Sequence, residues 1–583
     1  MYIRTTARKN KDGTTTQYVQ LAHNEWLPEA GRSNTKVLYN FGRREEVDIQ
    51  SLERLVGSIQ RFIGAEAPSA GAVYGSDLVI ESTRALGGSW FLNQYWQRLT
   101  IGQSFKRLLE ARGYEIPIER AIFAMVANRA LDPSSKLSCE KWVRDEAWIP
   151  SIESVCVHQL YRSMDFLAEN HEEIQKEIFF SVATVMNLEV DLLYFDTTST
   201  YFEIEGPDET VTEEEDKPRD EANSGNKDTN GGSNDKNSQG SKKSNGMRLY
   251  GHGKDHRDDL PQVVIGLAVT RDGIPIRCWV FDGNTTDVSI VGQVKKDLAG
   301  WRLNRVISVM DRGFASDGNC IKLQSGGGHY ILGEKMRSGK PEVTAALSKK
   351  GRYRSIDDDL FAKESIVGDG ECRKRYVIAY NPREAKKDRL TRERHLADIS
   401  DEIVKLAGMN ETDRTKATGA LVSHRTYGRY VRLLKNGQVK IDNAAVAAEK
   451  RLDGKYIIKT SDDTLSIEDI VLGYKQLKVI EADFRTLKTD LDLRPVYHRK
   501  PDRIKSHVLL CFFALLLIRV AENETGQTWF HIERELRKLN LILLKSPTSE
   551  VLQTTEPTPF QKAIFKKCKL EMPPRVLSIE ARP

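Results

Sequence analysis

The spacing of apolar residues changes several times along the chain, and each change marks a boundary between its parts. In the first ~70 residues, short runs such as 18–21 and 36–42 are separated by Gly, Asn and Asp, which is typical of strands. Over 89–188, apolar residues fall three or four positions apart, which predicts helices. The sequence therefore predicts a β-rich region at 1–75 and a helical domain at 76–188.

After the helical region the pattern becomes one of strands alternating with helices. Five apolar runs are typical of strands, at residues 192–195, 262–270, 274–281, 305–310 and 329–332. Arg271-Asp272-Gly273 is a hairpin signal between the second and third runs. Helix candidates at 288–298 and 316–323 stand between the later strands. This order predicts an α/β domain with a mixed five-stranded sheet and flanking helices.

The last third of the chain contains an amphipathic helix with two distinct stripes. Before it, residues 334–471 have a mixed pattern, and we interpret them as an inserted subdomain. The helix begins near Ile467 or Tyr474. Its apolar stripe consists of Leu477, Ile480, Phe484, Leu487 and Leu491. Its polar stripe, about 100° away, consists of Tyr474, Lys478, Glu481, Arg485 and Lys488. Glu481 therefore lies at the edge of the buried face, where its carboxylate can point into a cleft.

Residues 508–518 form the longest apolar run of the sequence. Eleven residues are about half the length needed to span a bilayer, so we expect a buried core helix and no membrane partner. For residues 526–583 we expect a C-terminal helix and tail that could make dimer contacts.

The composition is that of a soluble globular protein with several domains. At roughly 150 residues per domain, 583 residues predict about four structural units. Hydrophobic residues make up 39% and charged residues 29%, which excludes collagen-like, mucin-like and wholly disordered proteins. Seven scattered cysteines argue against a disulfide framework and a structural zinc site. We expect a cytoplasmic, nucleoid-associated protein. Since no Walker or dinucleotide motif occurs, we also expect no nucleotide cofactor.

The net charge of +5 is unevenly distributed. Residues 203–220 contain nine acids and two bases and carry −7, so the rest of the chain carries +5 − (−7) = +12. The surrounding stretch 206–246 is rich in Gly, Ser, Asn and Asp, and we expect it to be disordered. A basic body suits a polyanionic ligand, although charge alone also fits an ordinary solvated surface.

Three acidic residues stand where elements of the predicted sheet can bring them together. Asp196 ends the first strand, Asp311 ends the fourth, and Glu481 lies on the late helix. Clustered carboxylates repel one another unless a cation neutralises them. Two Mg²⁺ ions held by such carboxylates can support phosphodiester chemistry. Each acid alone is ordinary, as a turn former, a helix cap or an i,i+4 partner of Arg485.

Basic residues gather around and after the late helix. Residues 474–507 contain nine Lys or Arg and five acids, interleaved with aromatic and histidine side chains. Such a surface can neutralise DNA phosphates, and the alternative is an ordinary basic surface. The loop at 253–260 could contact DNA or line the active site, and the alternative is a solvated loop. The candidate DNA contacts are Tyr474, Lys478, Arg485, Lys488, Arg494, His498, Arg499, Arg503, Lys254 and Arg257.

These motifs resemble the DDE transposases of bacterial insertion sequences that carry a Tyr-x2-Arg-x3-Glu-x6-Lys signature. The segments 193–199 and 309–314 resemble the two aspartate segments of that family. Tyr474, Glu481 and Lys488 fall at the spacings of the signature, whereas Leu477 occupies its arginine position. The segments 253–260, 283–285 and 494–499 also look like the family.

The resemblance implies a ribonuclease-H-like catalytic core at 189–333 and 472–525, interrupted by a largely β insertion subdomain at 334–471. It implies catalysis by Asp196, Asp311 and Glu481, which would bind two Mg²⁺ ions, with Mn²⁺ as a substitute. The partners would be double-stranded DNA, as transposon ends and target, and a second copy of the chain. The regions 1–75 and 76–188 would bind the transposon ends.

The sequence thus predicts a transposase that cuts transposon ends and joins the 3′-hydroxyl to target DNA. Two alternatives stay open, a metal-dependent DNA nuclease without strand transfer and a non-catalytic DNA-binding protein derived from a transposase. A hairpin intermediate, which the signature implies, is in question because Leu477 interrupts the motif.

Overall fold

The structure is a computed structural model. It describes residues 2–9, 15–27, 32–44, 47, 48, 52, 55, 56, 59, 79–110, 117–188, 190–208, 246–301, 306–370, 373–546 and 549–581. Most of the stretch 206–246, for which we predicted disorder, lies outside these residues. The chain divides into two compact units, and each is described by itself.

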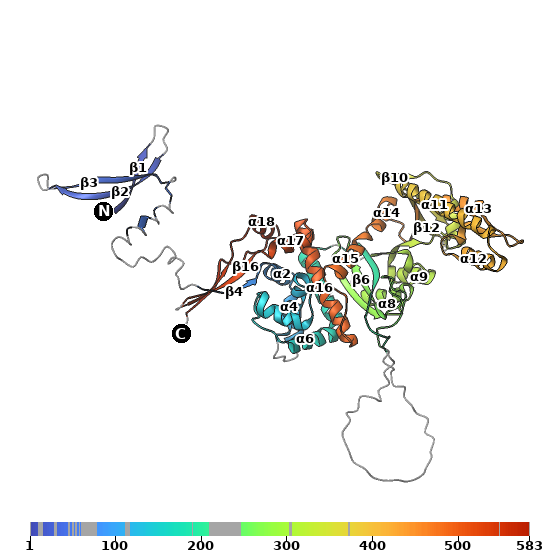
Figure 1. Ribbon diagram of the computed structural model, residues 1–583, viewed down its shortest axis with the longest axis horizontal. Helices are drawn as coiled ribbons and strands as arrows, with labels where there is room; N and C mark the ends of the chain where they lie inside the picture. Colours follow the sequence, from blue (N-terminus) through green and yellow to red (C-terminus); the bar gives the residue numbers. More distant parts are fainter. Residues whose placement is uncertain are drawn as a thin grey trace, which may run out of the picture. The chain divides into compact units, whose positions relative to one another are not determined.

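The first unit comprises Met1–Thr83, Leu541–Thr555 and Pro574–Pro583. Its N-terminal part is an antiparallel sheet of β1 (Tyr2–Lys9), β2 (Thr15–Leu27) and β3 (Arg32–Arg43), which confirms the predicted strands (Figure 1). A second sheet has the order β18-β17-β16-β4. Its strands are β4 (Val79–Ala85), β16 (Asn540–Lys545), β17 (Ser549–Thr554) and β18 (Val576–Ala581). The C-terminal region, for which we expected a helix and a tail, therefore also supplies three strands.

The second unit, Arg84–Asn540 and Glu556–Pro573, begins with the predicted helical domain. Its helices are α2 (Gly87–Arg98), α3 (Ile101–Glu110), α4 (Ile118–Leu131), α5 (Lys136–Lys141), α6 (Val157–Glu169) and α7 (His171–Met186). The late helix α16 (Pro501–Thr525) lies among them and packs on α4 and α6 (Figure 1). Two more helices follow it, α17 (Trp529–Leu536) and α18 (Pro559–Lys567).

The apolar part of α16, residues 508–518, is buried on all sides by the rest of the protein. Phe513 is fully buried and packs edge-on against Trp96 and Phe105 at ring-centroid distances of 6.4 and 6.0 Å. In the described part of the chain it is the one helix long and apolar enough to cross a membrane, and 89% of its apolar window is buried inside the protein. The prediction of a buried core helix at 508–518 is confirmed.

A large mixed sheet forms the centre of the second unit. The five predicted strands appear as β5 (Leu192–Tyr201), β6 (Gln262–Val269), β7 (Pro275–Asp282), β8 (Ile307–Met310) and β9 (His329–Glu334). They lie together in the order β9-β8-β5-β6-β7. β5 pairs in parallel with β8, and β8 with β9, whereas β6 and β7 are antiparallel. The predicted helices are also present, as α8 (Asp287–Ala299) and α9 (Asp317–Gln324).

The sheet is longer than the five strands we predicted. Four more strands extend it to nine, β10 (Arg354–Asp357), β11 (Leu360–Val367), β12 (Lys374–Tyr380) and β15 (Lys455–Thr460). They join through β15, which pairs antiparallel with β9. Strands of the segment 334–471, which we expected to form an inserted, largely β subdomain, therefore continue the central sheet. The added pairing covers the edge that β9 would otherwise leave exposed.

The rest of this segment surrounds the added strands. It contains α10 (Pro341–Ser348), α11 (Pro382–Ala407), α12 (Glu411–Ser423), α13 (Asn443–Lys450) and a small hairpin of β13 (Val431–Leu433) and β14 (Val439–Ile441). The charged helix predicted at 383–406 corresponds to α11.

The amphipathic helix predicted near 467–491 is divided into α14 (Ile467–Lys475) and α15 (Lys478–Thr489). Between the two helices the backbone forms a hydrogen bond of the 3-10 type, in which Leu477 N–H donates to the carbonyl of Tyr474, three residues earlier. The predicted apolar stripe begins at the break, where Leu477 is partly buried, and continues through Ile480, Phe484, Leu487 and Leu491, which are buried.

Candidate active site

One cleft in the second unit is lined by all three predicted carboxylates. It has a volume of about 630 Å³. Its lining residues are Asp196, Asp311, Asp357, Asp358, Asp359, Leu360, Asn381, Arg383, Tyr456, Tyr474, Lys475, Leu477, Lys478 and Glu481. Residues as far apart in the sequence as Asp196 and Glu481 thus face one space, between strands of the large sheet and the two helices α14 and α15.

Asp196 lies inside β5 and not at its end, which corrects our prediction. The strand continues to Tyr201 because β6 stays paired with it over the whole length. The parallel pairing with β8, however, stops at Phe195 and Met310. Asp311 is the next residue after β8, so both carboxylates sit where this ladder ends.

The face of β5 that carries Asp196 is the one covered by α14 and α15. Side chains alternate along a strand, so Asp196 shares its face with Tyr194. The Tyr194 hydroxyl donates to Gln476 Oε1 at 2.8 Å, at the break between the two helices. The break therefore brings the start of α15, and Glu481 with it, over the end of the ladder.

Asp196 lies in an environment that disfavours its charge. The pKa of Asp196 is raised to about 6, chiefly by burial and to a smaller extent by the carboxylates of Asp287 and Asp311, while Lys254 and the backbone N–H of Thr197 act in the opposite direction. Lys254 Nζ lies 3.4 Å from Asp196 Oδ1 and 3.6 Å from Asp287 Oδ2. It also donates to the Thr197 carbonyl at 2.6 Å. An ammonium group thus balances two of the carboxylates.

Asp287, in the first turn of α8, was not among our candidates. Its Oδ1 accepts a hydrogen bond from the Thr197 hydroxyl, in the residue after Asp196. Acidic residues are common in the first turn of a helix, because a negative charge there interacts favourably with the helix dipole. Asp287 therefore gave no signal of a functional role in the sequence. The only hint was its position two residues after the family-like segment 283–285.

Asp311 is held by a tyrosine of α14. The Tyr474 hydroxyl donates to Asp311 Oδ1 at 2.8 Å, and burial together with this carboxylate raises the pKa of Tyr474. The Tyr474 ring stacks on Tyr456 of β15 at a centroid distance of 5.8 Å. Gly333 permits this approach, because a Cβ there would lie 2.2 Å from the Tyr474 hydroxyl oxygen. The tyrosine of the signature thus orients the second aspartate.

Glu481 and a further group of acids form the exposed side of the cleft. Glu481 lies in the first turn of α15 and is exposed. Asp357 pairs with Lys475 at 3.0 Å, and this hydrogen bond lowers the pKa of Asp357. Asp359 pairs with Arg383 of α11. We missed these aspartates because a run of three acids in the sequence is also typical of a solvated turn.

The oxygen donors of the cleft fit a hard divalent cation. Within the described residues, no three His, Cys, Asp or Glu side chains stand close enough together to enclose a metal ion. Mg²⁺, however, is commonly held by one or two carboxylates together with phosphate oxygens of a substrate. Asp311 contributes to the raised pKa of Asp196, and the Lys254 ammonium lies beside Asp196 and Asp287.

The predicted DNA contacts divide into two groups by their surroundings. Lys478 lines the cleft, and Lys478, Arg485 and Arg499 are exposed. Others are held in ion pairs. Lys488 and Arg494 both pair with Asp255, at 2.9 and 2.7 Å, and Arg257 pairs with Asp259 at 2.8 Å. Lys488, the last residue of the signature, is only 12% exposed.

Two of the predicted contacts pack on the helical domain. Arg503 pairs with Asp165 of α6 at 3.0 Å and lies over the Tyr161 ring. His498 contacts the same ring, and burial lowers the pKa of His498 to about 4. His498 is therefore uncharged at neutral pH, and contact of either residue with DNA stays a prediction.

Comparison with known proteins identifies two regions of the chain. Residues 235–517 match the family model for the transposase DDE domain, and residues 3–69 match that for the N-terminal domain of IS1634 family transposases. The first match begins after β5, so Asp196 lies outside it, but it includes the strands β6 to β15 and the helices α14 and α15 with Asp311 and Glu481. The second match covers the N-terminal strands. No curated protein matches the chain.

Seven chains of solved structures match as well. One is the piggyBac transposase in a cryo-EM structure of its synaptic complex with hairpin DNA, with 10% sequence identity and a TM-score of 0.33. That match covers 77% of this chain and 78% of the other, and a TM-score this low does not assign the fold. On the two family matches, the chain belongs to the DDE-type transposases of insertion sequences.

Proposed function

We propose that this transposase cuts DNA at transposon ends and joins the resulting 3′-hydroxyl to target DNA, with Asp196, Asp311 and Glu481 as its catalytic residues. The observation that carries the proposal is their placement around one cleft, although 284 positions (481 − 196 − 1) separate the first from the last.

A ribonuclease-H-like core is part of the proposal. The strand order β9-β8-β5-β6-β7 supports it, with β5, β8 and β9 parallel and the β6–β7 hairpin antiparallel. In this arrangement the residue after β8 and a residue of β5 stand at the same end of a parallel ladder. Two carboxylates on different segments are thereby held by backbone pairing and not by loops.

We assign a role to each of four side chains in or beside the cleft. Asp196 is ionised at neutral pH, since its pKa is about 6. Tyr474 holds Asp311 through its hydroxyl and leaves the second carboxylate oxygen free for other contacts. Thr197 bonds Asp287, and so keeps a fourth carboxylate beside Asp196. Lys478 can bind a DNA phosphate at the edge of the cleft.

The carboxylates would hold divalent metal ions, as is general for transposases with this domain. When bound by Asp196, Asp311 and Glu481, two Mg²⁺ ions, or Mn²⁺ in their place, would supply activation of the attacking oxygen and stabilisation of the leaving oxygen. In the first reaction, a water oxygen attacks the phosphorus and the bond to the 3′-oxygen breaks. In the second, the oxygen of the freed 3′-hydroxyl attacks the phosphorus of a target phosphodiester, the bond from that phosphorus to the 3′-oxygen of the target strand breaks, and the proton of the attacking hydroxyl is lost while the target's 3′-oxygen leaves as a hydroxyl.

The wider assembly follows from the same proposal. Double-stranded DNA would be the partner, and pairing of two transposon ends would require two copies of the chain. The N-terminal sheet and the helical domain would bind the ends, in the cytoplasm, on the nucleoid.

A plasmid assay with Mg²⁺ tests the proposal. Wild-type protein should cut a plasmid that carries the ends of its own element and join them to a target. Asp196→Asn, Asp311→Asn and Glu481→Gln should each abolish both reactions while DNA binding persists. Cutting without joining would instead indicate a nuclease, and binding with neither reaction would indicate a non-catalytic DNA-binding protein. Activity that survives these substitutions would contradict the assignment of the triad.

A further inference from the structure

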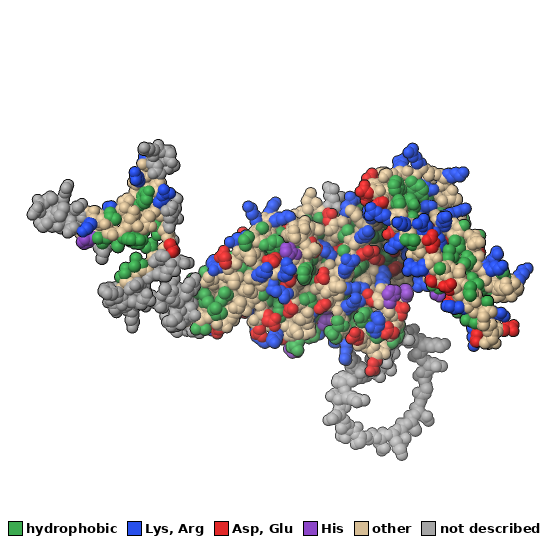
Figure 2. Space-filling view, turned by 45° about the horizontal axis from the view of Figure 1, so that its top comes forward, with side chains coloured by type: hydrophobic (Ala, Val, Ile, Leu, Met, Phe, Trp, Pro, Cys, Tyr) green, Lys and Arg blue, Asp and Glu red, His purple; other side chains and the backbone are tan. Residues whose placement is uncertain are grey.

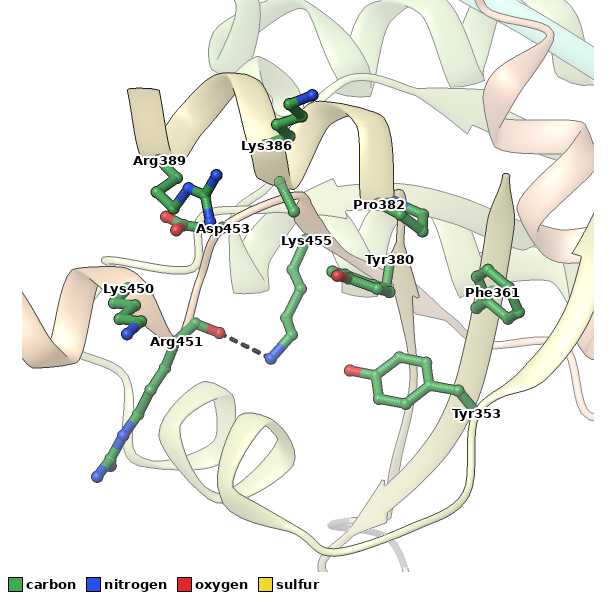
Figure 3. Close-up of a pocket in the computed structure, with 11 residues that line it drawn as sticks. Tyr353, Phe361, Tyr380, Pro382, Lys386, Arg389, Lys450, Arg451, Asp453 and Lys455 are labelled. Atoms are coloured by element: carbon green, nitrogen blue, oxygen red, sulfur yellow. Dashed lines mark hydrogen bonds between the residues drawn. The ribbon is translucent and has the colours of Figure 1, made fainter. Parts of the chain in front are cut away.

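A second cavity lies against α11, separate from the carboxylate cleft. It has a volume of about 890 Å³. Its lining residues are Tyr353, Phe361, Tyr380, Pro382, Ala385, Lys386, Arg389, Lys450, Arg451, Asp453 and Lys455. Figure 3 shows aromatic rings on one side of this space and basic side chains on the other. We call it the aromatic–basic pocket.

The floor of the pocket is built by strand register. Phe361 of β11 is paired with Tyr380 of β12, and Tyr380 is paired with Lys455 of β15. Residues opposite one another in a ladder point to the same face of a sheet, so these three side chains form one row. Tyr353 adds a ring at 6.0 Å from that of Tyr380. The result is an apolar aromatic surface with a cation at its end.

The pocket has more positive charge than its own acid can balance. It is lined by five Lys or Arg side chains and one carboxylate, Asp453, which is already paired with the buried Arg392 of α11. In the described part of the chain, Lys386, Lys450 and Arg451 form no ion pair. Lys455 extends into the pocket, where Nζ donates to the Arg451 carbonyl at 2.7 Å (Figure 3). The unpaired basic side chains favour an anionic ligand, and the aromatic row favours a ligand with a flat ring.

The pocket and the carboxylate cleft use opposite faces of the same strands. Lys455 lines the pocket, whereas its neighbour Tyr456 lines the cleft and stacks on Tyr474. Likewise, Phe361 lines the pocket and Leu360 the cleft. On the face seen in Figure 2, Lys and Arg side chains gather over the part of the protein that carries the large sheet and α11. The cleft and the pocket therefore share the strands β11 and β15, one on each face.

We infer that the aromatic–basic pocket binds an unpaired nucleotide of the DNA substrate, with its base against Tyr353, Tyr380 or Phe361 and its phosphate against Arg451 or Lys455. Paired bases are stacked inside a duplex and present no free ring face, so the aromatic row suits a single strand. The inference rests on the proposed function, because it takes DNA as the ligand.

Fluorescence anisotropy with two DNA probes tests the inference. The probes are a blunt duplex and the same duplex with a short single-stranded oligothymidine tail, in EDTA so that no cleavage occurs. Stacking of one base contributes about 1–3 kcal/mol, so the tail should raise the affinity of the wild-type protein about tenfold. An abasic tail should give a much smaller gain.

Three variants and one control assign the gain to the pocket. Tyr353→Leu removes a ring, and Arg451→Gln and Lys455→Gln each remove a charge. All three should reduce the gain from the tail at least threefold and leave binding of the blunt duplex unchanged. Arg394→Gln is the matched control, since Arg394 is exposed on the same helix, α11, but does not line the pocket.

The possible results separate this inference from the proposed function. If wild-type protein binds the blunt duplex and gains nothing from the tail, or if the pocket variants keep the full gain, the assignment of the pocket is wrong and DNA binding stands. If the variants weaken binding of both probes equally, the pocket grips duplex backbone and not an unpaired nucleotide. Protein that binds neither probe would contradict the proposed function itself.

Discussion

In and near the cleft, the charge and the orientation of single side chains depend on the groups that contact them. Asp196 is balanced by Lys254, and Asp311 is oriented by Tyr474. His498, by contrast, lies among cations and an aromatic ring, and is held uncharged by burial. These local environments give two predictions at the scale of the residue.

Tyr474→Phe should slow DNA cleavage about tenfold or more and leave the fold intact. The change removes the hydroxyl that donates to Asp311 but keeps the ring that stacks on Tyr456. A hydrogen bond to a charged group contributes about 1.5–3 kcal/mol, and ~1.4 kcal/mol corresponds to a factor of ten. Single-turnover cleavage of a labelled end measures the effect. Tyr456→Phe is the control, and an equal loss in both variants would contradict a specific role for the Tyr474 hydroxyl.

His498→Gln should make the protein less sensitive to acid. The folded pKa of His498, about 4, lies below the unfolded value, so the unfolded state binds more protons between about pH 4 and pH 6.5. Stability contributed by neutral His498 is therefore present above about pH 6.5 and is lost as the pH falls toward 4, by about 2 kcal/mol at pH 5.

Thermal unfolding at pH 7 and pH 5 checks this linkage. The decrease in Tm from pH 7 to pH 5 should be smaller for His498→Gln than for wild-type protein. His252→Gln should behave like wild type, because that side chain is 92% exposed. The same decrease in all three proteins would show that His498 titrates normally.

Among the elements, those with a strong periodic pattern were predictable from the sequence. All five strands of the first half of the sheet, their two helices and α16 occur where the spacing of apolar residues placed them. Asp311 followed its strand as expected, but Asp196 lies inside β5, since its Thr-rich continuation stays paired with β6. Apolar runs show where a buried strand begins more clearly than where its polar continuation ends.

Pairing between distant segments was beyond the sequence. The union of β9 with β15 depends on residues more than 120 positions apart, and no local pattern encodes it. For the same reason Asp287 and the acids at 357–359 were missed, because each is ordinary in its own helix turn or loop. The break at Leu477 was also missed, since the spacing of the polar stripe from Tyr474 to Lys488 continues across it.

A substitution in α16 should have a large effect on stability. Phe513→Ala removes a fully buried ring that contacts Trp96 and Phe105, and such changes cost about 3–5 kcal/mol. Phe530→Ala in α17 is the matched control, since that ring is 73% exposed. Soluble yield and Tm of the two variants should differ clearly. Equal values would mean that α16 does not form the core of the helical domain.

On the scale of the whole molecule, the surplus of basic residues should govern how tightly DNA binds. Each phosphate that a Lys or Arg neutralises contributes about −0.9 to the slope of log affinity against log salt concentration. Arg485→Gln and Arg499→Gln should each reduce the magnitude of that slope by about one. Both side chains are exposed, Arg485 in α15 and Arg499 ten residues after the end of that helix. Titration of a labelled duplex at several salt concentrations measures the slope.

A control from another part of the chain makes the salt experiment specific. Lys562→Gln, in α18, removes one positive charge from a residue paired with Glu556, and should leave the slope unchanged. Reduced slopes in all three variants would indicate a diffuse effect of net charge, and unchanged slopes would place DNA away from Arg485 and Arg499.

The strand β15 carries Lys455 and Tyr456 side by side, one on each face of the sheet. A shift of one residue in the pairing of β15 with its neighbouring strands would exchange the two faces, which would aim a lysine at the aspartates and a tyrosine at the opposite pocket. We therefore expect related transposases to tolerate changes of length in the loops at either end of β15 but to keep the number of residues within it constant. Substitutions can therefore change the cleft and the pocket one at a time, whereas a change in the register of β15 alters both at once.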